Sequence, residues 1–474
     1  ARLLRGHSVS PEAADPEARY PAAREQSRLF FLQSLSPASS AYNETFAFDI
    51  EGPLQAEQLR AALNVLVARH AALRTRFELV DGVVSAIPSA PYEVDLPCLP
   101  EAEAEARCNT PFDLSRPEML RASLTGLAQD RHLLFLTIHH IAIDGQSITE
   151  FLMQLSALLG GQPLASPAKP YQAFAQTRAD FRLSEGYDRQ IADWQQDLSQ
   201  ILPLGFQPLF PAEGHSGRAG GFHQASIGGA QWRALQVCAQ EHGVSLFALL
   251  ALLFANGLSR LTGRTDIAIG APVANRSLGD FERLVGMCVN TVPFFVEIRR
   301  DDRLGDAVTR LDRHLKRTLA RQDVDFDEVR DIAVATGRTT ALFDTMLVLE
   351  NTHLDQLKIG GANVTPRLYC KPEAKFPLTL FVTETSDGAD LVFEYQTAVL
   401  SPLQITALAD AIGCGASALP GSLALALGAL SVGADDGRAQ LRGWSEGSRV
   451  AIGEPWLPDA VKAHNPDDIA VSDQ

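Results

Sequence analysis

The spacing of apolar and polar residues predicts a mixture of strands and helices in the first third of the chain. Alternation is typical of a strand with one buried face, and apolar residues three and four positions apart are typical of a helix. The dipeptide Asp81-Gly82 predicts a tight hairpin turn. Strands are predicted at residues 46–50, 75–80, 83–86 and 133–138, a short helix or turn at residues 22–35, and a helix at residues 54–69. A further segment, residues 120–127, precedes the last of these strands.

Two stretches rich in proline and glycine, residues 160–170 and 203–221, interrupt the pattern, and a second unit is predicted to begin there. Strands and helices are interleaved without a glycine-rich phosphate loop, which favours an α/β sandwich over a dinucleotide-binding fold. The similar content of the two halves suggests two lobes, although the sequence shows no repeat. The second unit has predicted strands at residues 222–227, 266–270, 288–298, 341–349, 376–384 and 391–396, and helices at residues 245–261 and 304–321.

Composition indicates a globular protein with a large core. The chain has 474 residues, 46% of them hydrophobic, and a single core rarely grows beyond about 250–300 residues, so two or three domains are expected. No apolar run reaches the length of a membrane-spanning helix. The net charge of −16 argues against a nucleic acid or an anionic membrane as partner. The chain does not begin with Met and its N-terminal apolar stretch is too short for a signal peptide, so a piece of a longer protein is expected.

The cysteines favour neither a metal site nor a disulfide framework. None of the six has CxxC spacing and no histidine cluster completes a zinc pattern, so no metal is expected. Scattered thiols are typical of a reducing cytoplasm, which is the predicted compartment. The six are Cys98, Cys108, Cys238, Cys288, Cys370 and Cys414.

The chemistry most visible in the sequence follows the apolar run at residues 133–138, where His139 and His140 precede Asp144 and Gly145 in the pattern HHxxxDG. An imidazole titrates near neutral pH and can accept a proton from an attacking nucleophile. The carboxylate can pair with a cation or with backbone N–H groups. The glycine lets the backbone bend and approach a substrate. An active site is predicted here, against the alternative of a buried histidine pair beside a surface turn.

A helix is predicted to start directly after this pattern. Ser147 can cap residues 148–153, with Glu150 at the reciprocal position of a capping box. The histidines would then lie at a junction between a strand and a helix.

Seven stretches, in order along the chain, resemble motifs of one family, the condensation domains of nonribosomal peptide synthetases. The HHxxxDG element alone would also fit other acyltransferases related to chloramphenicol acetyltransferase. The departures from the family motifs include Ala173 in place of Asp, and Cys288 in place of Phe. The seven stretches are residues 25–32 (AQxRLWFL), 69–77 (RHxxLRTxF), 139–145 (HHxxxDG), 171–175 (YxDFAxW), 285–291 (VGxFVNT), 321–327 (HQDYPFE) and 341–345 (NPLF).

The resemblance implies an α/β fold of two chloramphenicol-acetyltransferase-like lobes that form a V with a tunnel between them. It implies amide formation between a donor acyl or peptidyl thioester and the amine of an acceptor aminoacyl thioester. Phosphopantetheine arms of an upstream and a downstream peptidyl carrier protein would deliver both, so the domain itself would bind no cofactor. The expected division is an N-terminal linker (1–20), an N-terminal lobe (21–180), a C-terminal lobe with a bridging loop and latch (181–430), and a linker toward an adenylation domain (431–474).

The resemblance also assigns roles to residues of the HHxxxDG stretch. It implies that His140 faces the tunnel and contacts the acceptor amine, as a base or as a positioning group, while His139 is structural. Asp144 is expected to form a buried pair with Arg276. Gly145 is expected to offer its backbone N–H near the reacting carbonyl.

Several expectations stay open at this level. Asn351 and Ser147 are candidates for the tunnel wall, and Arg24 and Arg28 for carrier-protein contacts. The acidic run at residues 323–328 is expected to be a solvated helix cap. The alternatives in function are a chain-initiating domain that joins a fatty acyl donor to the first amino acid, an epimerisation domain, a non-catalytic recruitment scaffold, and a free-standing CoA-dependent acyltransferase.

Overall fold

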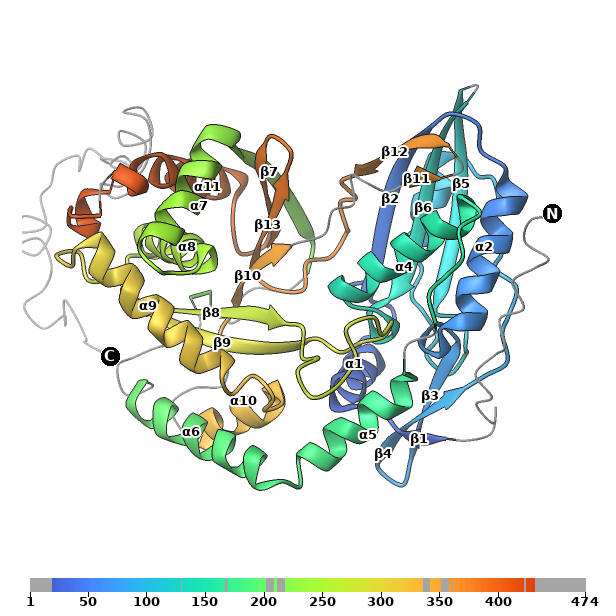
Figure 1. Ribbon diagram of the computed structural model, residues 1–474, viewed down its shortest axis with the longest axis horizontal. Helices are drawn as coiled ribbons and strands as arrows, with labels where there is room; N and C mark the ends of the chain where they lie inside the picture. Colours follow the sequence, from blue (N-terminus) through green and yellow to red (C-terminus); the bar gives the residue numbers. More distant parts are fainter. Residues whose placement is uncertain are drawn as a thin grey trace, which may run out of the picture.

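The computed structural model describes residues 19–430 except 129, 167–168, 202–208, 211–217, 336–341, 351–357, 360 and 422. These residues form two α/β lobes that lie side by side (Figure 1). Most of the two linkers predicted at the ends therefore lies outside the described residues. Tyr20, which the prediction assigned to the first linker, is buried in the short strand β1 (Tyr20–Pro21) against β4 (Val83–Pro88).

The N-terminal lobe is built on an antiparallel sheet of strand order β11-β12-β2-β6-β5. The leucines of α2 (Ala56–Arg69) share one core with α4 (Gly145–Leu159). The short helix α3 (Glu101–Cys108) covers the other face through Ala104 and Cys108. The strands are β2 (Asn43–Glu51), β5 (Leu120–Ala128), β6 (Arg131–His139), β11 (Lys358–Ile359) and β12 (Ala362–Arg367), and a small neighbouring sheet pairs β4 with β1 and β3 (Thr75–Val80).

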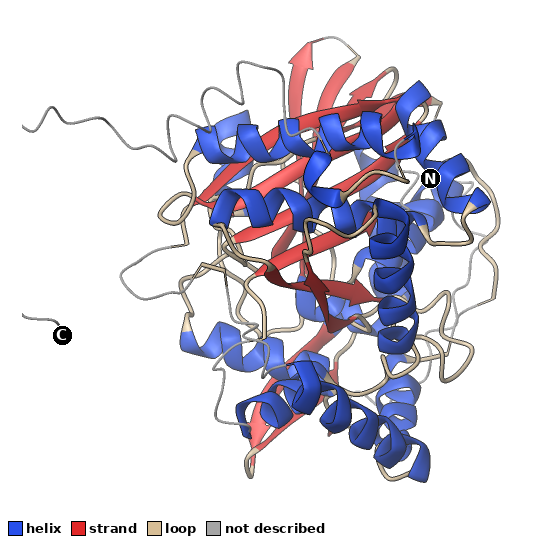
Figure 2. Ribbon diagram, turned by 90° about the vertical axis from the view of Figure 1, so that its left-hand side faces the viewer, coloured by secondary structure: helices blue, strands red, loops and turns tan. Residues whose placement is uncertain are grey.

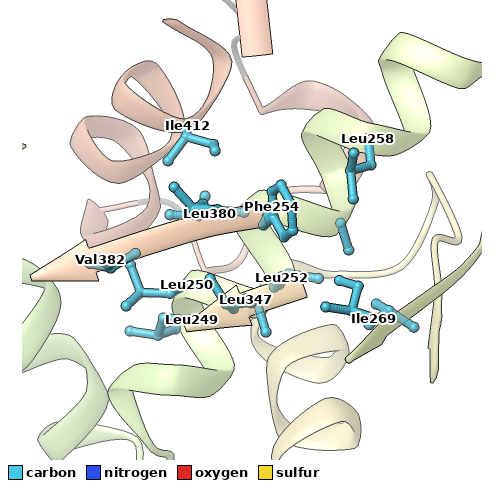
Figure 3. Packing of buried hydrophobic residues seen from close by; sticks show 14 of the residues in the cluster. Leu249, Leu250, Leu252, Phe254, Leu258, Ile269, Leu347, Leu380, Val382 and Ile412 are labelled. Carbon is cyan, nitrogen blue, oxygen red and sulfur yellow. The ribbon is translucent and has the colours of Figure 1, made fainter. Parts of the chain in front are cut away.

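The C-terminal lobe has a mixed sheet of order β7-β14-β13-β10-β8-β9, in which β10 runs parallel to both neighbours. Helices lie across its strands (Figure 2). The apolar helix α8 (Leu246–Thr262) packs into the core together with α11 (Pro402–Ala418) (Figure 3). The strands are β7 (Gly220–Gly228), β8 (Asp266–Val273), β9 (Asn290–Glu297), β10 (Thr345–Glu350), β13 (Leu378–Thr385) and β14 (Gly388–Gln396), and the other helices are α7 (Gly229–Glu241), α9 (Leu304–Leu319), α10 (Phe326–Ala335) and α6 (Glu185–Ile201).

Two segments that cross between the lobes hold them together. The first, which we call the bridging loop, comprises residues 274–289 between β8 and β9. The second, the crossing segment, comprises residues 368–377 and leads from β12 in the N-terminal sheet to β13 in the C-terminal sheet. A division by residue range is therefore incomplete, because β11 and β12 belong to the second half of the chain but complete the first sheet (Figure 1).

The predicted elements are present where the structure describes them, and the hairpin turn has the expected geometry. Asp81 and Gly82 adopt φ of 51° and 80°, which suits the two left-handed positions of a two-residue turn. The helices α3, α5 (Tyr171–Phe181), α6, α7, α10 and α11 were not predicted from the sequence patterns, although a capping box of Ser401 and Gln404 starts α11.

Among the described residues, no single helix is long and apolar enough to cross a membrane. Taken together, α7 and α8 have the length and apolar composition of a membrane span, but the chain bends by 114° between the two helices.

The bridging loop is packed tightly against α5. The Tyr171 hydroxyl donates a hydrogen bond to the carbonyl oxygen of Met287. A Cβ atom at Gly286 would lie only 2.2 Å from Cδ2 of the Tyr171 ring. The ring cannot move away without losing this hydrogen bond, so the close approach requires glycine at position 286.

We expect Gly286→Ala to lower the free energy of unfolding by about 1–3 kcal/mol, because the added methyl group overpacks a buried site. Urea denaturation of the whole chain measures this. Gly413→Ala is the matched control, since a Cβ atom there meets nothing within 4 Å among the described residues. This helical substitution should raise stability by up to about 1 kcal/mol. Equal effects of the two changes would contradict the packing argument.

Candidate active site

His139 ends β6 with its ring fully buried. Its Nδ1 accepts a hydrogen bond from the backbone N–H of Ile141 at 3.1 Å, and its ring meets the Phe112 ring edge-on. Burial lowers the pKa of His139 to about 3. His139 is thus a neutral, buried residue at the end of the strand.

His140 lies in a different environment. Its backbone N–H donates to the carbonyl oxygen of Tyr42 at 2.8 Å, and its Nδ1 lies 2.7 Å from the carbonyl oxygen of Ile143. Because a carbonyl can only accept, Nδ1 carries the proton and Nε2 carries the lone pair. Burial, and then the positive charge of Lys375, lower the pKa of His140 below its usual value. The side chain is 20% exposed, so Nε2 belongs to a neutral imidazole that is only partly covered.

Asp144, rather than Ser147, caps the helix that follows. Its carboxylate accepts a hydrogen bond from the backbone N–H of Ser147 at 2.9 Å, and α4 begins at Gly145. The predicted capping box of Ser147 and Glu150 is therefore wrong, because the capping residue is Asp144, three positions earlier in the chain. An acidic side chain suits this position because the first N–H groups of a helix have no partner within the helix. Glu150 instead pairs with Arg283 at 2.9 Å.

The predicted ion pair between Asp144 and Arg276 is present. Arg276 Nη2 lies 2.9 Å from Asp144 Oδ1, and the two side chains are 4% and 1% exposed. The second carboxylate oxygen accepts the backbone N–H groups of Cys288 and Val289 at 2.9 and 3.1 Å. Burial opposes the charge on Arg276, but Asp144 holds its pKa above the usual value. The pair thus anchors the start of α4 to the bridging loop.

The prediction that Ser147 lines a tunnel is wrong, because its side chain is fully buried. Its hydroxyl accepts hydrogen bonds from Arg276 Nη2 at 2.9 Å and from the Gly286 N–H at 3.1 Å, and it lies 2.9 Å from the Gly286 carbonyl oxygen. Ser147 therefore belongs to the same anchor. Asn351, the other tunnel-wall candidate, lies outside the described residues.

Gly145 is exposed at the first position of α4. Its φ is not in the left-handed region, so a sharp bend is not the reason for glycine here. A Cβ atom at this position would meet nothing within 4 Å among the described residues. The glycine therefore leaves open space at the positive end of the helix dipole, where a polarised carbonyl can approach.

Residues 25–32, the first of the seven family motifs, lie in α1 (Arg24–Leu35) and contact the turn that follows His140. Gln26 Nε2 donates to the Ile141 carbonyl oxygen at 3.1 Å. The neighbouring Glu25 accepts a hydrogen bond from Asn275 of the bridging loop at 2.9 Å. These two residues thus connect α1 to the turn after His140 and to the bridging loop, and the sequence alone did not reveal either contact.

The acidic run at residues 323–328 lies at the start of α10, as expected of a helix cap, but Asp323 and Asp325 are buried rather than solvated. Asp325 is 3% exposed and lies 3.0 Å from Arg178, which is itself buried, and 3.2 Å from Arg182. The described residues contain no group of three His, Cys, Asp or Glu side chains that could hold a metal ion. The run is an ion-pair cluster that joins α5 to α10.

The two arginines of α1 proposed for carrier contacts also face this cluster. Arg24 pairs with Glu328 at 2.8 Å and with Asp325 at 3.4 Å. The guanidinium of Arg28 lies 4.6 Å from the centre of the Phe326 ring. Both therefore have intramolecular partners at the start of α10, which weakens their case as docking residues.

Three charged residues beside His140 were missed by the sequence reasoning. Glu44 of β2 lies 3.9 Å from His140 Nε2 and pairs with Lys371 and Lys375 of the crossing segment. Burial works to raise the pKa of Glu44, but the two lysines hold it well below its usual value. The sequence does not mark Glu44, because it is one of three acidic residues on β2, and no local pattern connects it to lysines 327 and 331 residues away.

We expect Asp144→Asn to lower the free energy of unfolding by about 3–5 kcal/mol, because Arg276 would then be a buried charge without its counterion. Urea denaturation measures the loss. Asp410→Asn, at an exposed position of α11, is the matched control and should change stability by less than about 0.5 kcal/mol.

The double variant Asp144→Asn/Arg276→Gln should recover part of this loss, since it removes both charges. A single Asp144→Asn variant as stable as the control would contradict the anchoring role of the pair.

Comparisons with known proteins identify the family and the fold of this chain. The family model described as "Condensation domain" matches residues 17–413. Surfactin synthase subunit 1 of Bacillus subtilis (strain 168) is 29% identical over 84% of this chain and 11% of its own length. Chondramide synthase cmdD of Chondromyces crocatus is 31% identical over 80% of this chain and 10% of its own length. The chain thus spans about a tenth of the length of these curated relatives.

Solved structures share the fold at low identity. The first condensation domain of the CDA synthetase has a TM-score of 0.76 at 21% identity and covers 88% of this chain and 100% of its own. The X-domain from teicoplanin biosynthesis has a TM-score of 0.75 at 20% identity, with the same coverage. Because the family match spans nearly all of the two-lobed fold, this chain belongs to the condensation domain family of nonribosomal peptide synthetases.

Proposed function

We propose that this chain joins a donor acyl or peptidyl thioester to the amine of an acceptor aminoacyl thioester. The observation that carries the proposal is the state of His140. Its Nδ1–H is occupied by the Ile143 carbonyl oxygen, while Nε2 bears a lone pair on a neutral and partly exposed ring. The other side chains of the HHxxxDG stretch are buried as scaffold. One basic nitrogen is thus presented to a substrate.

The reaction needs little more than this. A thioester is already activated, so the amine nitrogen attacks the carbonyl carbon, and a tetrahedral oxyanion forms. The C–S bond then breaks, and the departing sulfur takes up the proton that the nitrogen loses and leaves as the thiol. The ammonium form of an α-amine has a pKa near 8, so the amine must be neutral to attack, and its nitrogen loses one further proton to form the amide. His140 Nε2 accepts that proton or orients the amine. The N–H of Gly145, at the positive end of α4, stabilises the oxyanion.

We propose that both substrates arrive on phosphopantetheine arms, from an upstream donor and a downstream acceptor peptidyl carrier protein. The domain itself would bind no cofactor and act in the cytoplasm, next to an adenylation domain of the same synthetase. The curated relatives, which are synthetase subunits, support this arrangement. So does the likeness in fold to a four-domain nonribosomal peptide synthetase, of which this chain covers 34%.

Two solved structures keep specific alternatives open. The starter condensation domain of rhizomide synthetase RzmA, in complex with C8-CoA, has a TM-score of 0.74 to this chain. It supports testing a chain-initiating reaction with a fatty acyl donor. The teicoplanin X-domain in complex with OxyB has the same fold, with a TM-score of 0.74, and supports testing a recruitment scaffold. A scaffold would bind a partner without forming an amide.

We expect His140→Ala to slow amide formation by roughly 10²–10⁴-fold, the usual contribution of a positioned acid or base. Mass spectrometry of products from carrier-bound acceptors, with peptidyl-carrier, fatty-acyl-carrier and acyl-CoA donors, measures the rate and identifies the preferred donor. His132→Ala, at the opposite end of β6, is the matched control and should retain activity. A wild-type chain that forms no amide with any donor would favour the scaffold.

We expect His140 to remain neutral down to a pH below 6.5, the ordinary value for histidine, because its pKa is lowered by burial and by Lys375. A histidine limb in the rate profile should therefore lie below pH 6.5. Protonation of the acceptor amine produces a second limb in the same profile. An acceptor with a less basic amine moves this amine limb and leaves the histidine limb in place, so the two can be told apart. A histidine limb above pH 6.5 would contradict the charge environment described here.

A further inference from the structure

The Lys371–Glu44–Lys375 cluster lies beside the imidazole on which the proposed function depends. Lys371 Nζ lies 2.7 Å from Glu44 Oε2, and Lys375 pairs with Oε1. The same Oε1 is 3.9 Å from His140 Nε2. All four side chains are 16–20% exposed. Each oxygen of the carboxylate thus has its own ammonium partner, and the histidine is a third neighbour.

The backbone of the crossing segment fixes the direction of the two lysines. Glu373, between them in sequence, accepts hydrogen bonds from the Ser39 hydroxyl at 2.6 Å and the Ser40 N–H at 3.2 Å. On the other side, the Gly220 N–H donates to the Pro372 carbonyl oxygen at 2.9 Å. The segment is therefore held by both lobes, and its lysines are delivered to Glu44 as part of the fold.

The charges near the ring oppose one another. A carboxylate beside an imidazole favours the protonated ring, and a nearby ammonium disfavours it. The groups that face His140 are Lys375, Glu44 and Lys371, with His139 behind it. Farther out, Glu394 of β14 and Glu350 of β10 face the lysines. With Glu44 alone, His140 would be drawn toward an imidazolium, which has no lone pair for an amine.

We infer that Lys371 and Lys375 are positioning residues for the condensation reaction: by holding both oxygens of Glu44, they keep its carboxylate from drawing a proton onto His140. The inference deepens the proposed function and rests on it for its catalytic meaning. The pKa values agree in direction. Lys375 lowers the pKa of His140, Glu44 raises it, and Lys371 lowers it less than Lys375 does.

The test follows the titration of His140 directly, in the whole chain labelled with ¹³C-histidine. The signal is identified by its loss in His140→Gln. We expect Lys375→Met to move the titration to higher pH, since it removes the lysine charge that lowers the pKa of His140 the most. Lys375→Arg keeps the charge and should leave the titration near that of the wild type. Lys358→Met, on an exposed lysine of β11, is the matched control and should not move it.

A second change separates the charge effect from a general disturbance. Glu44→Gln in the Lys375→Met background removes the carboxylate that draws the proton, so the titration should return toward lower pH. The histidine limb of amide formation should follow the same order of variants. Unchanged His140 titration in Lys375→Met, or no reversal by Glu44→Gln, would overturn the inference. Because the titration needs no substrate, a wild-type chain that forms no amide would overturn the proposed function separately.

Discussion

The buried pair of Asp144 and Arg276 is the constraint on which the site depends. Removing a carboxylate from water is costly unless all its lone pairs find partners. Asp144 meets this requirement with one guanidinium and with backbone N–H groups of Ser147, Cys288 and Val289. Those groups come from α4 and from the bridging loop. One charge therefore fixes where the helix starts, how the loop runs and how the two lobes meet beside the histidines.

The two adjacent histidines show how environment, rather than residue type, sets chemical character. His139 is turned into the core, and burial keeps its ring neutral. His140 begins the turn after the strand, where Ile143 fixes its tautomer and leaves Nε2 at a partly exposed edge. The charged cluster around Glu44 lies next to that edge, with Glu44 Oε1 3.9 Å from Nε2. Because β6 ends at His139 and the chain turns at His140, the first imidazole is part of the core and the second is partly exposed.

Much of the fold and part of the site could be predicted from local sequence. The alternating strands, the Asp81-Gly82 turn and the apolar helix α8 follow from short-range patterns, because backbone preference and burial act within a few residues. The pair of Asp144 with Arg276 was expected from the family resemblance. The helix cap was misplaced because Asp144 and Ser147 are both good capping residues, and only the demand of Arg276 for a counterion selects between them.

The sequence by itself determined most of the strands, the helices α1, α2, α8 and α9, the HHxxxDG stretch and the family to which they point. Only the tertiary structure decided that Ser147 is buried in the anchor, that Arg24 and Arg28 have partners on α10, and that Glu44 meets Lys371 and Lys375. These contacts join residues far apart in the chain, and a charged side chain carries no local mark of its partner. Electrostatic pairing depends on distance in space, and that distance exists only once both sheets and the segments between them have formed.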